Sequence, residues 1–354
     1  MSTSKACATP LFFSISLACS AASDGDAHES STAGDDDDTS GAAGDTAADD
    51  TAAADAGDDD DTADDDDTAD DGPVPVGIVV DHESIALFDE LPDGAVADAA
   101  AMRMFFMDRS VGGNIDEGLS CLAVAHAEAP NHCVRADHAV PEFSVDPAEV
   151  AWAGTYDRAN WSFMFWPEGC DEWRGSVDCF VAATTPMVDE LDVASFQFSY
   201  LAVGAGSDIA DPALGFFADN ADRGDVFDYG AFAAAHPNTT LVYWTTSLAR
   251  GIGTVESRDF NSAMRSWAIE HEVPLFDVAD ILSHAPDGTP CYDNRDGTAY
   301  LDENHPDDGV DIPAICPHYT SETEGGHLGS PSAGKIRVAK AFWVLMARIS
   351  GWQP

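Results

Sequence analysis

The chain has 354 residues, with 65 acidic side chains against 15 Lys and Arg, and its formal net charge at pH 7 is -50. A surface this negative repels phosphate backbones, which excludes histone-like and DNA-tracking functions. The charge is compatible with a saline environment, because about 0.15 M salt already limits the reach of repulsion between exposed charges to ~8 Å.

Residues 1–19 have the pattern of an export signal. A single basic residue, Lys5, precedes an apolar run over residues 10–18 that is too short to cross a bilayer. The run ends in Ser16-Leu17-Ala18-Cys19, which is similar to a bacterial lipobox. The sequence therefore predicts an exported lipoprotein on the outer membrane or cell surface, anchored at Cys19. The alternative is a secretory signal that is cleaved near Ala21.

Residues 20–72 are built almost entirely from Asp, Ala, Thr, Gly and Ser. They contain 20 Asp and one Glu but no Lys or Arg. Low hydrophobicity and dense like charge cannot offset the entropy of the chain, so we expect a disordered, extended tether. The folded domain is then expected over residues 73–354.

Within residues 73–354, apolar stretches of strand length alternate with helical patterns. A helix is expected over residues 257–271, where Phe260, Met264 and Trp267 recur at spacings of three and four. Another is expected from Ser332, a suitable N-cap, to Gly351. Strands are expected over residues 102–107, 196–203, 241–245 and 273–278. This alternation indicates an α/β domain with a mostly parallel sheet covered on both faces, in which ligands bind at the carboxyl ends of the strands.

Eight cysteines are present, and six remain once Cys7 and Cys19 are assigned to the signal and the lipid site. None of these six has the short spacing of zinc ligands, so an exported protein favours disulfides. Connectivity is open among about 15 arrangements. The arrangement that closes the shortest loops joins Cys121 to Cys133, Cys170 to Cys179, and Cys291 to Cys316.

The first expected strand runs into Asp108-Arg109-Ser110, and a helical pattern follows from Asp116 to Ala123. A serine at a turn from strand to helix projects its hydroxyl at the edge of the sheet, and the amides of the following turn point toward any oxyanion formed there. Ser110 is therefore a candidate nucleophile. The alternative is an ordinary turn or N-cap serine.

The loop before the last helix contains Glu324-Gly325-Gly326-His327. A carboxylate near a histidine can accept the proton of Nδ1 and leave Nε2 free to activate a hydroxyl. His327 is therefore a candidate general base, and the alternative is a polar loop residue. Eight other histidines lack this setting, and most are expected at the surface or in structural roles: His126, His132, His138, His236, His271, His284, His305 and His318.

An acidic loop over residues 292–303 partly matches a calcium-binding loop. Its Asn294, Asp296, Gly297 and Glu303 fall at suitable offsets, but the first ligand position is Tyr292. Weak Ca²⁺ binding and an acidic loop bounded by a disulfide both remain open. No other metal and no cofactor is expected.

Together, the segments around Ser110 and His327 resemble the GDSL/SGNH hydrolase superfamily. Residues 110–115 are similar to the Ser-Val-Gly-x-Asn-Ile block of some bacterial members, and Gly326-His327-Leu328 is also typical. The resemblance covers roughly residues 77–352 and implies a three-layer α/β/α sandwich of flavodoxin-like type. It further implies ester hydrolysis, with Ser110 as nucleophile, His327 as base and then acid, and Glu324 orienting the imidazole.

The chain departs from the family pattern in three places. Asp108-Arg109-Ser110 stands for Gly-Asp-Ser, Glu324 stands for an aspartate, and no asparagine follows the strand that is expected to end at Val203. That asparagine normally completes the oxyanion hole, and the loss of one donor typically costs ~2.7–4 kcal/mol. The candidate donors are Ser110, Gly154, Asn114 and Ser207.

The sequence predicts an exported serine esterase that needs no cofactor, with O-acyl groups of glycans or small molecules as reasonable substrates. Two alternatives remain open: a non-catalytic surface binding module on the same fold, and an O-acyltransferase. No nucleic-acid partner is expected. Contact with a membrane is expected only through the N-terminal lipid.

Overall fold

The structure, a computed structural model, describes one unit of the chain within Ala69–Pro354. The expected export signal, Cys19 and the acidic tether lie outside the described residues. The described residues are 77–123, 133, 156–167, 170, 175–199, 203, 207, 211, 215–219, 224–249, 254–293, 299–300, 303–304, 311–322, 325–329 and 332–354.

A six-stranded sheet forms the centre of the domain, with the strand order β1-β6-β5-β4-β2-β3. Every neighbouring pair in it is parallel, which confirms the expected sheet type. A separate antiparallel hairpin joins β7 (Ala299–Tyr300) to β8 (Glu303–Asn304). The six strands are β1 (Val79–Val80), β2 (Met104–Asp108), β3 (Trp161–Phe165), β4 (Val193–Phe196), β5 (Thr240–Trp244) and β6 (Leu275–Phe276).

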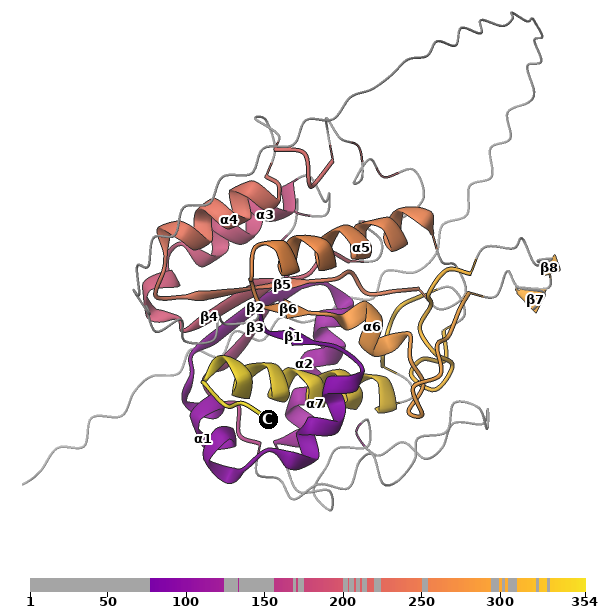
Figure 1. Ribbon diagram of the computed structural model, residues 1–354, viewed down its shortest axis with the longest axis horizontal. Helices are drawn as coiled ribbons and strands as arrows, with labels where there is room; N and C mark the ends of the chain where they lie inside the picture. Colours follow the sequence, from indigo (N-terminus) through magenta and orange to yellow (C-terminus); the bar gives the residue numbers. More distant parts are fainter. Residues whose placement is uncertain are drawn as a thin grey trace, which may run out of the picture. The chain divides into compact units, whose positions relative to one another are not determined.

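Helices cover both faces of the sheet, as the three-layer expectation requires (Figure 1). One face carries the 3₁₀ helix η1 (Glu83–Glu90), α1 (Asp93–Ala101), α2 (Ser110–Leu122) and α7 (Ser332–Ile349). The short helix α6 (Val278–Leu282) follows β6 and buries its side chains in the same core. The other face carries α3 (Ser176–Thr184), α4 (Val226–Ala235) and α5 (Val255–Glu270), and a short 3₁₀ turn, η7 (Val188–Glu190), precedes β4.

Strand β2 shows why this sheet needs two covering layers. All five of its residues are buried, and successive side chains of a strand point to opposite faces. Met104 and Phe106 accordingly pack into the core beneath α2 and α7, whereas Phe105 and Met107 pack into the core beneath α3, α4 and α5. A strand that is apolar on both sides is typical of the interior of a parallel sheet.

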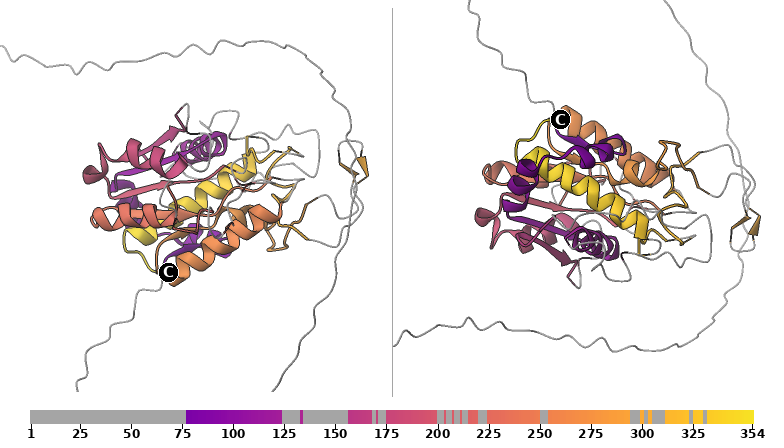
Figure 2. Two further views of the ribbon diagram at one scale, coloured as in Figure 1. Left: turned by 90° about the horizontal axis from the view of Figure 1, so that it is seen from above. Right: turned by 90° about the horizontal axis from the view of Figure 1, so that it is seen from below.

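Helix α7 lies across the middle of its face, where the right-hand view of Figure 2 shows it in yellow. It packs extensively against α2, and the close approach depends on Gly118, because a Cβ there would overlap the carbonyl oxygen of Lys335. The Lys335 side chain is only 1% exposed, and its Nζ donates to Glu117 Oε2 at 2.8 Å. Among the described residues, no helix is long and apolar enough to cross a membrane.

The expected strand over residues 273–278 is shorter in the structure, where β6 covers Leu275–Phe276, and two further element boundaries differ more from the expectation. Residues 196–203 were expected as a strand, but β4 ends at Phe196. Phe198 and Val203 still join the core, so burial beyond the carboxyl end of the strand produced the same apolar pattern. Helix α2 was expected from Asp116, yet it begins at Ser110, because Gly112 and Gly113 are accommodated in its first turn.

Three disulfides join cysteines that are neighbours in the sequence. They link Cys121 to Cys133, Cys170 to Cys179, and Cys291 to Cys316. Disulfides persist in oxidising compartments, so the domain is compatible with a secreted protein.

Candidate active site

Ser110 lies at the carboxyl end of β2, where the chain turns into α2. It is the first residue of that helix, and the preceding Arg109 takes the N-cap position without a side-chain cap. The first amides of a helix have no hydrogen-bond partner within the helix. They form the positive end of the helix dipole, which stabilises a negative charge placed nearby. The backbone therefore gives Ser110 the setting that an attacking hydroxyl and a nearby oxyanion need.

His327 reaches this point from the loop before α7, which is tied down on two sides. The Thr320 hydroxyl donates to the carbonyl of His327 at 2.6 Å and accepts from the amide of Glu322 at 3.1 Å. On the other side, the amide of Leu328 donates to Asn114 Oδ1 on α2 at 2.7 Å. These contacts hold the imidazole against the start of α2, although His327 and Ser110 are 217 residues apart.

A serine, an imidazole and a carboxylate form a continuous hydrogen-bonded row. Ser110 Oγ lies 2.7 Å from His327 Nε2, and His327 Nδ1 lies 2.8 and 2.9 Å from the two carboxylate oxygens of Glu322. The His327 amide also donates to Glu322 Oε2 at 3.0 Å. The side chains of His327 and Glu322 are 39% and 37% exposed, so a substrate can reach the row from solvent.

The carboxylate in this row is not the one that the sequence suggested. Glu324 lies outside the described residues, and the carboxylate that faces Nδ1 belongs to Glu322, five residues before His327. Gly325 allows this arrangement, because a Cβ at that position would overlap the Glu322 carboxylate. We therefore assign the orienting role to Glu322 instead of Glu324.

The candidate oxyanion donors have different positions. The Ser110 amide is at the start of α2, and the Asn114 side chain is one turn further along, with its oxygen already bound to Leu328. The Ser207 hydroxyl oxygen is buried and has no hydrogen-bond partner among the described residues. Gly154 lies outside the described residues. Hydrogen bonds thus join Ser110 and Asn114 to the His327 loop, whereas Ser207 makes no such bond to a described residue.

Asp108 is a fully buried carboxyl group two residues before Ser110. Its Oδ1 accepts from the Arg109 amide at 2.6 Å, while Oδ2 faces Gly112 without a full hydrogen bond to any described residue. Burial raises the pKa of Asp108 to about 7, although the amides of Arg109 and Gly112 and the charge of Arg109 act to lower it. The group therefore titrates near neutral pH beside the candidate nucleophile.

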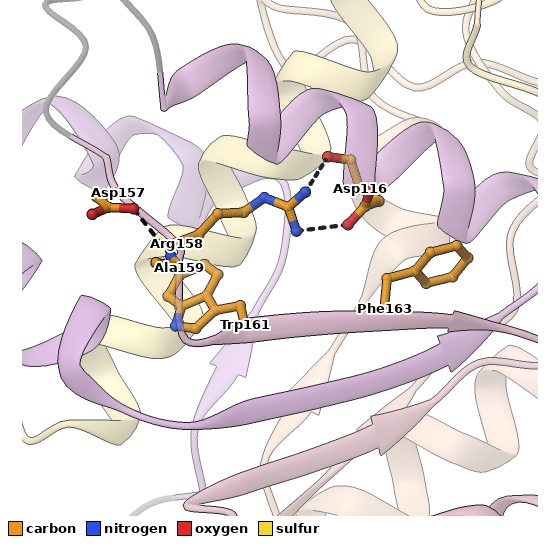
Figure 3. Close-up of a pocket in the computed structure, with 6 residues that line it drawn as sticks. All are labelled: Asp116, Asp157, Arg158, Ala159, Trp161 and Phe163. Atoms are coloured by element: carbon orange, nitrogen blue, oxygen red, sulfur yellow. Dashed lines mark hydrogen bonds and ion pairs between the residues drawn. The ribbon is translucent and has the colours of Figure 1, made fainter. Parts of the chain in front are cut away.

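A hollow of about 380 Å³ lies between α2 and the edge strand β3, and Figure 3 shows its lining. Arg158 and Asp116 line the hollow and bind each other: Arg158 Nη1 donates to Asp116 Oδ1 at 2.6 Å, and Nη2 donates to the Asp116 carbonyl at 3.1 Å. Phe163 also lines the hollow and lies against Gly112, because a Cβ at Gly112 would be 2.7 Å from its ring. Phe163 therefore contacts both the hollow and the first turn of α2, which begins at Ser110.

The expected calcium loop is only partly described. Asn294, Asp296 and Gly297 lie outside the described residues, as does the side chain of Glu303. The base of the loop is closed by Cys291–Cys316, a bridge between Tyr292 and Pro313, and a 3.0 Å bond from the Asp293 amide to the Ile312 carbonyl. The Ca²⁺ site therefore stays a prediction.

Sequence reasoning missed Glu322, Thr320 and the positioning role of Asn114. Thr320-x-Glu322 before a double glycine is a signal that could have been used, because a threonine hydroxyl often bonds an amide two residues on. No protein-family model, curated protein or solved structure matches this chain.

Proposed function

We propose that this protein is a serine hydrolase of the GDSL/SGNH type that cleaves carboxylic esters. The single observation that carries the proposal is the 2.7 Å contact between Ser110 Oγ and His327 Nε2, with Glu322 on the opposite nitrogen of the same ring. A nucleophile in contact with a base that is itself oriented by a third group is the arrangement that covalent acyl transfer requires.

In the proposed reaction, Ser110 Oγ attacks the ester carbonyl while His327 Nε2 takes its proton. Glu322 accepts the Nδ1 proton in a hydrogen bond, which fixes the tautomer and stabilises the imidazolium. His327 then gives the proton to the departing alcohol, and the acyl group stays on Ser110. A water molecule, deprotonated by His327, attacks the acyl-enzyme and releases the acid and the free serine.

The oxyanion of each tetrahedral intermediate would lie at the start of α2. The Ser110 amide and the helix dipole act there without any rearrangement. Asn114, Ser207 and Gly154 remain candidates for the second donor. The neutral form of Asp108 favours this step, because an uncharged carboxyl group does not repel a developing negative charge.

The substrate class that fits best is an O-acyl ester on a glycan or a small polar molecule. The hollow between α2 and β3 combines the ring of Phe163 with the charged groups of Arg158 and Asp116, and this mixture of apolar and polar surface suits a polar ligand such as a sugar. Phe165, 53% exposed at the carboxyl end of β3, is paired in register with Asp108 and adds a further apolar surface beside the serine.

We also propose that the enzyme works outside the cell on a lipid anchor at Cys19, with residues 20–72 as a spacer. Three disulfides support export, and the lipobox-like Ser16-Leu17-Ala18-Cys19 supports the anchor. Metabolic labelling with a palmitate analogue tests the anchor: label is expected on the protein and absent from a Cys19→Ser variant.

Labelling of the folded protein with a fluorophosphonate probe tests the catalytic proposal. We expect label on Ser110, loss of the label in Ser110→Ala, and retention in Ser266→Ala, whose hydroxyl bonds a backbone carbonyl on the exposed face of α5. Hydrolysis of a simple acetyl ester should fall by several powers of ten in Ser110→Ala. A folded protein that is neither labelled nor active would reject the enzyme and favour a binding module, while acyl transfer to a sugar acceptor in the product analysis would favour the transferase.

A further inference from the structure

A second histidine site lies at the other edge of the sheet. His82 follows β1 and His284 follows α6, and their rings are stacked with centroids 3.7 Å apart and planes within 10°. Asp280 of α6 serves both rings: its Oδ2 is 2.5 Å from His82 Nδ1, and its Oδ1 is 3.4 Å from His284 Nδ1. The three side chains come from segments about two hundred residues apart, and all of them are half-buried.

The hydrogen bonds set the tautomers of both rings. His284 Nδ1 lies 2.9 Å from the backbone carbonyl of Asp280, which can only accept, so that nitrogen carries the proton. His82 Nδ1 faces the Asp280 carboxylate and carries a proton for the same reason. Each neutral ring therefore has its lone pair on Nε2, and neither Nε2 has a hydrogen-bond partner among the described residues. Histidines that bind metals are typically oriented in this way, with the other ring nitrogen donating to a carboxylate or carbonyl.

The charges around the cluster favour a cation. Asp280 accepts hydrogen bonds from the His82 amide at 3.0 Å and from the His82 ring at 2.5 Å. The guanidinium of Arg265 is committed to Asp277 through bonds of 2.5 and 2.9 Å. In the described part of the chain, the ion-pair partners of Asp280 are the two imidazoles alone.

A neutral imidazole is the form that binds metals. We propose that His82 and His284, whose Nδ1 sides are held by Asp280, form a binding site for a divalent transition-metal ion of the Zn²⁺ type.

Imidazole ligands suit Zn²⁺ and not Ca²⁺, which prefers oxygen alone. One nitrogen of the His82 ring and one of the His284 ring lie within 4.8 Å of each other, and a Zn–N bond is about 2.0–2.1 Å. Because a metal lies in the plane of each ring that binds it, at least one ring has to turn out of the stack. Water can complete the coordination, since the cluster is reachable from solvent.

The site would brace the region that carries His327. The Tyr319 hydroxyl donates to the His284 carbonyl at 2.9 Å, and Tyr319 directly precedes Thr320, whose hydroxyl holds the His327 loop. The strands β6, β5 and β4 separate β1 from β2, so the proposed ion is structural and takes no part in the chemistry at Ser110.

Zn²⁺ titration of the full mature chain by calorimetry tests this inference. The protein is first freed of metal, and a large excess of Ca²⁺ is kept present to occupy sites made of carboxylates alone, including those of the acidic residues 20–72. We expect one Zn²⁺ per chain, and at least ~10-fold weaker binding in His82→Asn and in His284→Asn. The control is His271→Asn, because His271 also stacks on a ring and bonds the carbonyl four residues earlier at 2.9 Å, but among the described residues it contacts neither a carboxylate nor a second histidine.

Thermal unfolding and Co²⁺ absorption separate loss of the metal site from loss of the fold. Thermal unfolding in a chelator shows whether each variant is folded, and Zn²⁺ should raise the melting temperature of the parent and of His271→Asn but not of the two site variants. Co²⁺ in place of Zn²⁺ should give absorption bands typical of nitrogen ligands in the parent only. Absence of Zn²⁺ binding in excess Ca²⁺, or equal binding by folded His82→Asn and His284→Asn, would overturn the site whether or not Ser110 is reactive.

Discussion

Two sites in this domain pair an imidazole with a carboxylate, and they differ in what faces the other ring nitrogen. At His327, Glu322 holds Nδ1 and a serine hydroxyl lies 2.7 Å from Nε2. At His82 and His284, Asp280 holds the Nδ1 side of both rings, and a second imidazole is stacked alongside.

A carboxylate on Nδ1 is therefore common to a candidate catalytic site and a candidate metal site. It fixes the tautomer and the direction of the ring, and the group presented to Nε2 decides the chemistry. A hydroxyl at that nitrogen can be deprotonated for attack, whereas a second lone pair nearby can complete a set of metal ligands.

The largest effect is expected from Glu322→Gln. Without the negative charge, the imidazolium that forms during attack loses its stabilisation, so fluorophosphonate labelling and ester hydrolysis should slow by about 10³- to 10⁴-fold. Glu324→Gln is the informative companion variant. If the loss occurs at position 324 and not at 322, the orienting carboxylate is the one that the sequence suggested, and our assignment is wrong.

Asp108 differs from Glu322 and Asp280, because it is a buried carboxyl group that contacts no imidazole among the described residues. Its pKa is about 7 when folded against an ordinary value of 3.8, so the folded protein binds the extra proton between these values and becomes less stable as pH rises through them. Three pH units correspond to about 4 kcal/mol. Urea unfolding should show Asp108→Asn gaining up to that amount relative to the parent between about pH 4 and about pH 8; a difference that does not change with pH would contradict the raised pKa.

Asp280→Asn removes the shared carboxylate of the second site. Hydrogen bonds to charged groups contribute about 1.5–3 kcal/mol each when one partner is removed, and we expect a loss of unfolding free energy in this range near neutral pH. The pKa of Asp280 is lowered by folding, so its contribution is present above the unfolded value and disappears as the carboxylate is protonated in acid. A variant that is destabilised equally at all pH values would argue for lost packing instead of lost charge.

Gly325→Ala tests the geometry of the His327 loop. The added methyl group would displace the Glu322 carboxylate from Nδ1, and a misplacement of about 1 Å can cost up to about 100-fold in rate, so we expect labelling to slow by about 10- to 100-fold. The matched control is Gly329→Ala, where the nearest atom to the added carbon would be Asn114 Nδ2 at an ordinary 3.6 Å. Equal effects at both positions would mean that the loop simply tolerates no side chains.

The smallest effect is expected at Asn114, which accepts a bond from the Leu328 amide. Asn114→Ala should lower the unfolding free energy by about 1 kcal/mol, and Asn114→Asp, which keeps the accepting oxygen, should retain most of it. The same pair tests the oxyanion hole. If Asn114→Asp slows labelling by about 10²- to 10³-fold, the Asn114 amide group is a donor to the oxyanion.

Most of the layer architecture could be predicted from the sequence, because buried strands and amphipathic helices leave local patterns. Residues 102–107 and 241–245 correspond closely to β2 and β5, and the last helix begins at Ser332 as expected. Strand β1 has only two residues, and β3 at the edge of the sheet is half exposed, so neither leaves the continuous apolar run of an interior strand.

The site was only partly predictable for a similar reason. Ser110 and His327 stand at an expected strand end and before an expected helix, so order along the chain indicated both. The choice between Glu322 and Glu324 depends on how tightly Gly325 lets the loop turn, which spacing does not determine. The stack of His82 on His284 arises from two distant segments, and no local pattern could reveal it.

The closed base of the loop between Cys291 and Cys316 has a consequence for proteolysis. A protease that cuts anywhere between residues 294 and 310 would leave both fragments covalently joined by the disulfide. The bridge between Tyr292 and Pro313 would hold the start of the segment that leads to His327 in place. Nicked protein should then migrate as one band without reductant and as two bands with it. His327, the proposed general base, would stay beside Ser110, so the proposed esterase should remain active after such a cut.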